Sequence, residues 1–139
     1  MSYINSYLTF GGNCREAMSF YKDCLGGELT FQTVGESPMA AEMPDEMKAY
    51  ILHSTLSNGA LTLMGSDMVS NEGLITGNAI ALMLNCNSEE ELKRCYEKLA
   101  AGGVATHPVE NTFWGAMFGD LTDKFGNRWM LNYTKEQKQ

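Results

Sequence analysis

The chain has 139 residues, of which 44% are hydrophobic and 19% are charged, so it is long enough to bury the core of one globular domain. Its formal net charge of -7 argues against binding to nucleic acid or to an anionic membrane surface, because both require a basic patch. No apolar run reaches the roughly 18 residues typical of a membrane-spanning helix. Residues 1–10 lack the basic start and apolar stretch of a signal peptide. We therefore expect a cytoplasmic protein that binds neither nucleic acid nor membrane.

The first half of the chain predicts one helix among four strands. Residues 3–10 alternate in polarity, which is typical of a strand. Asn13 with Glu16 three residues later has the pattern of a capping box, and Gly26-Gly27 marks the helix end. Further strands are expected at 28–34, 49–56 and 60–65, with a loop at 36–48 and a tight turn at Ser57-Asn58-Gly59.

The second half repeats the same order of elements. A strand is expected at 78–86, and Ser88 with Glu91 forms a capping box at the start of a helix that ends at Gly102-Gly103. Strands follow near 104–107, 113–121 and 127–132. The pattern predicts a single α+β domain over 1–139, with a first module at 1–66, a linker at 67–77 and a second module at 78–133.

The four cysteines, Cys14, Cys24, Cys86 and Cys95, are expected to be buried, reduced thiols. None of them forms a CxxC pair. Cys14 and Cys24 would lie about 15 Å apart along one helix, which is beyond the reach of a disulfide. Metal or redox roles are the alternative.

Two segments of the chain resemble the PhnB-like branch of the vicinal oxygen chelate superfamily, which includes glyoxalase I, bleomycin-resistance proteins and extradiol dioxygenases. The segments are FGGNCREAMSFYKDCLGGE, residues 10–28, and NTFWGAMFGDLTDKFGNRWMLN, residues 111–132. The resemblance covers nearly the whole chain. It implies a glyoxalase/bleomycin-resistance-like fold, in which two βαβββ modules form a curved mixed sheet around a cleft. It also implies a homodimer.

In this fold the helices cover one face of the sheet, and the other face lines the cavity. Alternation along the strands predicts which side chains lie on each. Those expected to face the helices are Leu8, Phe10, Leu61, Leu63, Ile80, Leu82, Leu84, Trp129 and Leu131. Those expected to face the cavity are Asn5, Tyr7, Thr9, Thr62, Met64, Ala79, Ala81, Met83, Arg128 and Met130.

The resemblance also implies where metal ligands would lie: on the first strand of each module and on the last strand of the chain. These positions fall at Asn5 (or Ser6, if the register differs by one), at Ala79 and at Met130. Asn is a poor ligand for a divalent ion, Ala is none, and Met suits only soft metals. We therefore expect no metal and no other cofactor.

His53 is the histidine that the resemblance favours for function, because relatives of this branch often carry His in the matching strand. If it faces the cavity, it is the only side chain there that could exchange protons near neutral pH. A structural hydrogen-bonding role is the alternative. His107, before Pro108 at a strand end, lies away from the expected ligand positions.

The other candidate ligand-binding residues offer mixed chemistry: Tyr7 a hydroxyl, Met64 and Met130 adaptable apolar surface, Trp114 and Phe118 stacking surfaces, and Arg128 a cationic fork for a carboxylate or phosphonate. Arg128 could equally form a structural ion pair with Asp120 or Asp123. The methionines could equally fill a core.

These observations predict a glyoxalase-like protein that binds a small apolar or anionic molecule without a metal. Whether it is an enzyme is left open. One alternative is a metal-assisted lyase, isomerase or dioxygenase-type enzyme with a displaced metal site. Another is an interaction module without a functional cavity. The methionine-rich loop 36–48 could be a lid or a dimer contact.

Overall fold

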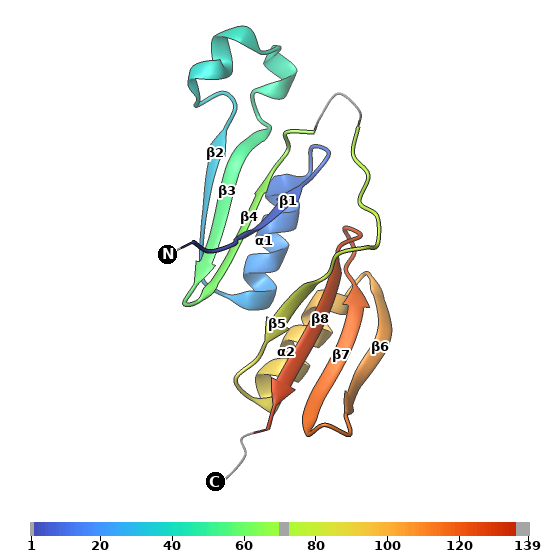
Figure 1. Ribbon diagram of the computed structural model, residues 1–139. Coiled ribbons are helices and arrows are strands. Elements are labelled where there is room, and N and C mark those ends of the chain that lie inside the picture. Colours follow the sequence, from blue (N-terminus) through green and yellow to red (C-terminus); the bar gives the residue numbers. More distant parts are fainter. Residues whose placement is uncertain (1, 70–72, 136–139) are drawn as a thin grey trace. The chain divides into compact units, whose positions relative to one another are not determined.

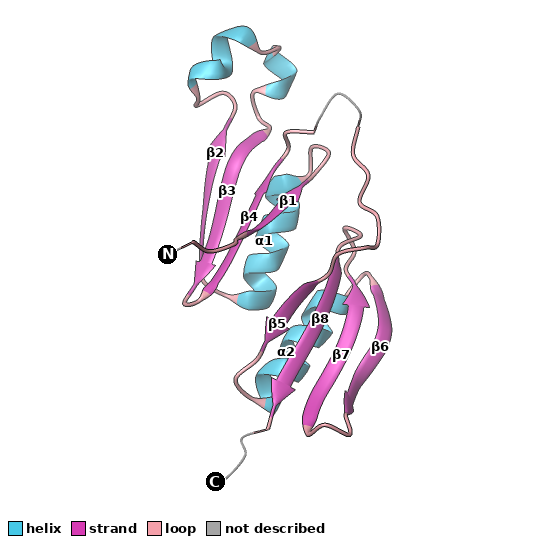
Figure 2. Ribbon diagram, viewed as in Figure 1, coloured by secondary structure: helices cyan, strands magenta, loops and turns pink. Residues whose placement is uncertain are grey.

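The structure is a computed structural model that describes residues 2–69 and 73–135. The chain divides into two compact units, residues 1–75 and 76–139, and each is one βαβββ module (Figures 1 and 2). The first contains β1 (Ser6–Thr9), α1 (Cys14–Leu25), β2 (Glu28–Thr33), the 3-10 helices η1 (Pro38–Glu42) and η2 (Asp45–Met47), β3 (Ile51–Asn58) and β4 (Leu61–Ser66). The second contains β5 (Leu82–Asn85), α2 (Glu89–Ala100), β6 (Val104–Asn111), β7 (Ala116–Thr122) and β8 (Arg128–Thr134).

The two modules have the same sheet topology. The strand order is β1-β4-β3-β2 in the first and β5-β8-β7-β6 in the second. In each sheet the first strand pairs in parallel with the last, and the remaining neighbours are antiparallel. The expected α+β fold of two βαβββ modules with mixed sheets is thus confirmed.

In the first module α1 packs against β2, β3 and β4. The helix buries one face: Cys14, Ala17, Met18, Tyr21 and Cys24. Leu56 of β3 and Leu63 of β4 are buried beneath it. Gly65 has the same orientation, since a Cβ there would touch Met18 and Cys14. This alternation places the intervening side chains of β3 and β4 on the opposite face.

In the second module α2 packs against β6, β7 and β8, and Figure 1 shows it behind the strands. Its buried residues are Leu92, Cys95, Tyr96 and Leu99, and those of the strands include Leu121, Trp129 and Leu131. A Cβ at Gly119 would meet the ring of Tyr96, which fixes the helix-facing side of β7. We call the face of each sheet opposite its helix the helix-free face.

Several element boundaries differ from the predicted ones. β5 begins only at Leu82, so Ile80 lies before the strand and is 81% exposed, and its expected contact with the helix is wrong. β6 continues past Pro108 to Asn111, because it is an edge strand in which the missing N–H of proline costs no ladder hydrogen bond. The predicted loop 36–48 contains the two 3-10 helices.

The start of α1 also differs from the prediction. Asn13 is the N-cap residue, but its side chain makes no capping hydrogen bond. Instead the buried carboxylate of Asp67, in the predicted linker, accepts the amides of Gly12 and Cys14 at 3.0 and 2.9 Å and that of Ile51 at 2.8 Å. The helix start is therefore fixed by a residue distant in sequence.

The start of α2 follows the prediction. Ser88 accepts the amide of Glu91 at 3.1 Å. The Glu91 carboxylate accepts the amide of Asn87 at 3.0 Å, one residue before the position that a capping box uses. All four cysteines are buried and form no disulfide, as expected. None of the helices in the described part of the chain is long and apolar enough to cross a membrane.

Candidate functional site

Three of the predicted site residues lie together on the helix-free face of the first module. Tyr7 of β1 pairs directly with Met64 of β4, and Met64 pairs with Thr55 of β3. His53, two residues before Thr55, lies on the same face, because the intervening Ser54 points to α1 and contacts the Cys14 thiol. The face thus combines a phenol, an imidazole and a thioether.

His53 is held by hydrogen bonds at both ring nitrogens. Its Nδ1 lies 3.3 Å from the Tyr7 hydroxyl, and its Nε2 lies 3.1 Å from the Thr55 hydroxyl. The Tyr7 and His53 rings are also in contact, with centroids 5.8 Å apart. The imidazole is therefore fixed in orientation between two hydroxyls. The Tyr7 end of this hydrogen-bonded series is accessible to solvent, since the Tyr7 side chain is 51% exposed.

Thr55 is a member of this cluster that the sequence did not single out. Side chains two residues apart in a strand lie on the same face, so the spacing of His53 and Thr55 within 49–56 is the signal that could have identified Thr55. Gln32, the partner of His53 on β2, and Thr30, the partner of Thr55, extend the polar surface. On the other side, the Asn5 amide lies 4.0 Å from the Met64 sulfur.

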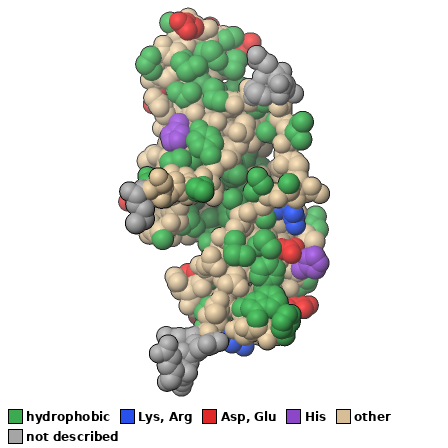
Figure 3. Space-filling view, viewed as in Figure 1, with side chains coloured by type: hydrophobic (Ala, Val, Ile, Leu, Met, Phe, Trp, Pro, Cys, Tyr) green, Lys and Arg blue, Asp and Glu red, His purple; other side chains and the backbone are tan. Residues whose placement is uncertain are grey.

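The helix-free face of the second module carries a different row of side chains at the equivalent strand positions. Paired residues run across it in the order Met83, Met130, Asp120 and His107, one from each of β5, β8, β7 and β6. Figure 3 looks onto this face and shows hydrophobic side chains gathered over the strands. The row has an apolar end, where the Met83 side chain is 51% exposed, and a charged end at Asp120 and His107.

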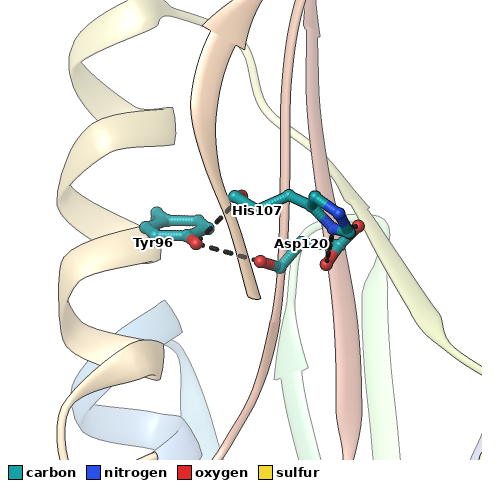
Figure 4. A network of polar contacts seen from close by, with 3 residues as sticks. All are labelled: Tyr96, His107 and Asp120. Atoms are coloured by element: carbon teal, nitrogen blue, oxygen red, sulfur yellow. Dashed lines mark hydrogen bonds and ion pairs between the residues drawn. The ribbon is translucent and has the colours of Figure 1, made fainter. Parts of the chain in front are cut away.

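His107 and Asp120 form a close imidazole–carboxylate pair at the charged end. The Nδ1 atom of His107 lies 3.0 and 2.9 Å from the two Asp120 oxygens. From the opposite side of the sheet, the Tyr96 hydroxyl of α2 donates to the backbone carbonyls of His107 and Asp120 at 3.0 and 2.9 Å (Figure 4). Burial, and secondarily the Asp120 charge, raise the pKa of Tyr96, so this donor stays protonated.

Arg128 and Phe118 belong to the second module, whereas the His53 cluster belongs to the first. The Nη1 atom of Arg128 donates to the Asn78 carbonyl at 2.7 Å. The two carboxylates considered as its partners have other roles: Asp120 binds His107, and Asp123 accepts the amides of a turn and the Trp129 indole. Phe118 is paired with Asn132 on the helix-free face.

Trp114 lies in the turn between β6 and β7, outside both sheets. Its ring packs edge-on against Phe113, with centroids 4.9 Å apart, and both side chains are exposed. The stacking surface expected of Trp114 is thus at the end of the second sheet, while that of Phe118 is on its face.

The positions implied for metal ligands carry no conventional ligand set. Asn5 is next to Met64, Met130 is in the row with Asp120, and Ala79 lies before β5 rather than within it. Within residues 2–69 and 73–135, no three His, Cys, Asp or Glu side chains are grouped so that they could hold a metal ion.

Comparison with known proteins relates this arrangement to a family. The sequence model of the glyoxalase/bleomycin resistance protein/dioxygenase superfamily matches residues 3–131. Protein YjdN of Escherichia coli (strain K12) is 33% identical over 144 residues, which cover 96% of this chain and 97% of that protein.

Two solved structures are similar over nearly the full length. Protein PA1353 from Pseudomonas aeruginosa is 37% identical, with a TM-score of 0.82, and the match covers 98% of this chain and all of the other. A PhnB protein from Bacillus cereus is 26% identical, with a TM-score of 0.72, over 96% of this chain and all of the other.

Proposed function

The chain belongs to the glyoxalase/bleomycin resistance protein/dioxygenase superfamily, and on this premise we propose that it binds a small molecule without a metal, through the helix-free face of its first module. The observation that carries the proposal is the hydrogen-bonded chain of Tyr7, His53 and Thr55 beside Met64. This combination offers a fixed polar contact next to an adaptable apolar one, which is the usual composition of a small-molecule site.

The polar hydrogens of Tyr7, His53 and Thr55 support a proposal for the kind of ligand group that would bind to them. With a neutral imidazole, Tyr7, His53 and Thr55 carry three polar hydrogens, and two of them form the internal bonds. If Nδ1 accepts from Tyr7, Nε2 donates to Thr55 and the Thr55 hydrogen is free. In the other tautomer the Tyr7 hydrogen is free. Either way one hydroxyl can donate to a ligand, so the site favours an oxygen acceptor such as a carboxylate or carbonyl.

A protonated imidazole would strengthen this preference. Both ring nitrogens then donate to the two hydroxyls, and both hydroxyl hydrogens become available to the ligand. The positive charge also attracts an anion. We therefore propose that the preferred ligands are small carboxylates or related anions with an apolar part that lies against Met64.

The test measures binding of benzoate, phenylphosphonate and the neutral analogue benzyl alcohol by calorimetry and by NMR chemical-shift mapping, with EDTA present. We expect the anions to bind more tightly than the alcohol and to shift the signals of His53 and its neighbours. Tyr7→Phe and Thr55→Val each remove one hydroxyl and should weaken binding about threefold to tenfold.

Tyr3→Phe is the matched control, because Tyr3 is exposed and lies outside the hydrogen-bonded chain. It should leave binding unchanged. The proposal fails if none of the three probes binds in EDTA. Binding or turnover that appears only after a divalent ion is added would replace it with the metal-assisted alternative.

We also propose that the protein acts in the cytoplasm as a homodimer, as its resemblance to the PhnB-like branch suggests. Mass photometry of the purified protein should give a mass near twice that of one chain, and fluorescence of a tagged copy should fill the cell interior. A single species of monomer mass would overturn the dimer.

A further inference from the structure

The imidazole–carboxylate pair of the second module presents a ring nitrogen to solvent. The Nδ1 atom of His107 lies 3.0 and 2.9 Å from the two oxygens of Asp120. An ionised carboxylate only accepts hydrogen bonds, so Nδ1 carries the hydrogen and Nε2 of the neutral ring has a free lone pair. The His107 side chain is 74% exposed, and no residue of the described chain forms a hydrogen bond with Nε2. The pair therefore holds an oriented nucleophile that a small molecule can reach.

The backbone holds this pair in place although the strand around it is irregular. The register of β6 against β7 shifts on both sides of His107, between Val104 and His107 and between His107 and Glu110. At His107 itself, the Tyr96 hydroxyl donates to the carbonyls of both members of the pair (Figure 4). Irregularities of this kind redirect a side chain and are common beside active sites.

Gly119 allows Tyr96 to reach these carbonyls from the other side of the sheet. A Cβ at this position would come within 3.1 Å of the Tyr96 ring and of the His107 carbonyl oxygen. The residue between the two strand partners of the network is therefore one that leaves space for it.

The surface next to the pair is apolar, and its His107 end is negatively charged. Met130 and then Met83 continue the row from the pair. Because neighbouring strands lie about 4.8 Å apart, Met130 is about 10 Å and Met83 about 14 Å across the sheet from His107. Glu110, opposite Phe118 on the same face, adds a second carboxylate near the pair. This surface favours a neutral molecule with an extended apolar part.

We propose that His107 is the nucleophile of a site that hydrolyses neutral esters of medium-chain acids. Asp120 is its positioning residue, and the acyl chain lies over Met130 and Met83. The proposal does not depend on the ligand site of the first module, since all of these residues belong to the second.

The reaction balances with water as the second reactant. The Nε2 lone pair of His107 attacks the ester carbonyl carbon, the C–O bond to the alcohol breaks, and the alcohol leaves with the bonding electron pair. The acyl-imidazolium that forms is positively charged, and Asp120, bound to Nδ1–H, stabilises it. Water then adds to the acyl carbon and the C–N bond breaks. One ester and one water thus become one acid and one alcohol, and His107 returns to its first state.

The test follows the hydrolysis of p-nitrophenyl acetate, butanoate and octanoate by the full chain at neutral pH. We expect the octanoate to react at least about tenfold faster than with N-acetylhistidine at the same concentration, because the ester is held next to the ring. The acetate should gain less, because it has no chain to lie on the methionines. Acid quenching and peptide mass spectrometry should place the octanoyl group on His107.

Three variants separate the roles, and circular dichroism checks that each is folded. His107→Gln should abolish the enhancement. The amide in Asp120→Asn can donate to Nδ1 and carries no charge, so kcat should fall about tenfold while KM stays the same. Met83→Ser should lower the ratio of the octanoate rate to the acetate rate about threefold.

Glu97→Gln is the matched control for Asp120→Asn, because it also removes one negative charge, from an exposed position of α2. Its kinetics should equal those of the wild type. The proposal is overturned if His107→Gln hydrolyses the octanoate as fast as the wild type, if the wild type reacts no faster than N-acetylhistidine, or if the octanoyl group is found on another residue. The last two measurements use the wild type alone and stand even if a variant does not fold.

Discussion

At the scale of single residues, one buried carboxylate organises the polar backbone of each module. Asp67 is 4% exposed and accepts the amides of Gly12, Cys14 and Ile51, which joins the start of α1 to the start of β3. Asp123 accepts two turn amides and the Trp129 indole. Buried polar groups are stable only when they are paired, so these carboxylates are structural rather than chemical sites.

Asp67→Asn should destabilise the first module strongly. The Asn side chain would present its NH₂ group to one of the backbone N–H donors, so at least one buried backbone N–H loses its acceptor. The remaining hydrogen bonds become weaker, because their acceptor no longer carries a negative charge. We expect the free energy of unfolding to fall by about 2–3 kcal/mol. Urea unfolding followed by circular dichroism measures it.

Asp45→Asn is the control for this prediction, because the Asp45 carboxylate is almost fully exposed and forms a surface ion pair with Lys48. Its effect should stay below about 0.5 kcal/mol. Equal effects of the two substitutions would contradict the role assigned to Asp67. The sequence could not reveal this role, because the three donors to Asp67 become neighbours only in the folded module.

At the scale of elements, the two helices begin in different ways. α2 has a local cap, in which Ser88 accepts the Glu91 amide. α1 has Asn13 at the same position without a side-chain bond, and its first amides bind Asp67 instead. Similar sequence signals therefore have different energetic weight, because a remote carboxylate replaces the local cap in one helix.

The effects of removing the two caps should differ accordingly. Ser88→Ala should lower the free energy of unfolding by about 1 kcal/mol, since it leaves the Glu91 amide without its acceptor. Asn13→Ala should change it by no more than about 0.3 kcal/mol, because no side-chain bond is lost. Thermal and urea unfolding of both variants give the comparison, and a larger loss for Asn13→Ala would contradict it.

Local periodicity was sufficient to predict the order of the elements but not all their limits. Alternation and the glycine pairs located α1, α2 and the strands β1 to β8 of the described residues, because these signals lie within short segments, but they did not indicate the two 3-10 helices in the predicted loop 36–48. The late start of β5 and the extension of β6 past Pro108 depend on which neighbour each strand finds. Pairing partners are a property of the sheet, and a single strand does not encode them.

At the scale of the whole molecule, the duplication repeats a steric requirement as well as a topology. A Cβ at Gly27 would collide with the Ser57 carbonyl oxygen, and a Cβ at Gly103 would collide with that of Thr122. Both glycines follow the helix of their module, where the chain passes against the backbone of a neighbouring strand. Each module therefore needs a residue without a side chain at this point.

Gly27→Ala and Gly103→Ala should each destabilise the protein by at least about 2 kcal/mol, because the obstructing atoms are backbone and cannot turn aside. Gly27 adds a positive φ of 100°, which disfavours alanine further. Gly11→Ala is the control, since its nearest neighbour would be 4.0 Å away. Calorimetric melting of the three variants tests this, and a neutral Gly103→Ala would contradict it.

Only part of the candidate site followed from the sequence. Alternation gave orientations for Tyr7, Met64 and Met130, because orientation is a local property of a strand. The contact of Tyr7 with His53 depends on the register of β1 and β3 against β4, and the His107–Asp120 pair depends on the register of β6 against β7. These registers arise from the assembled sheet, so the partners of both histidines could not be read in advance.

The matching registers of the two sheets have a consequence for engineering. Tyr7, Met64, Thr55 and Thr30 in one module occupy the strand positions that Met83, Met130, Asp120 and His107 occupy in the other. The helix-facing side chains support the framework, while these two rows are free to differ. Each module therefore presents its row on the same framework, and we expect the row of one module to be tolerated at the equivalent strand positions of the other.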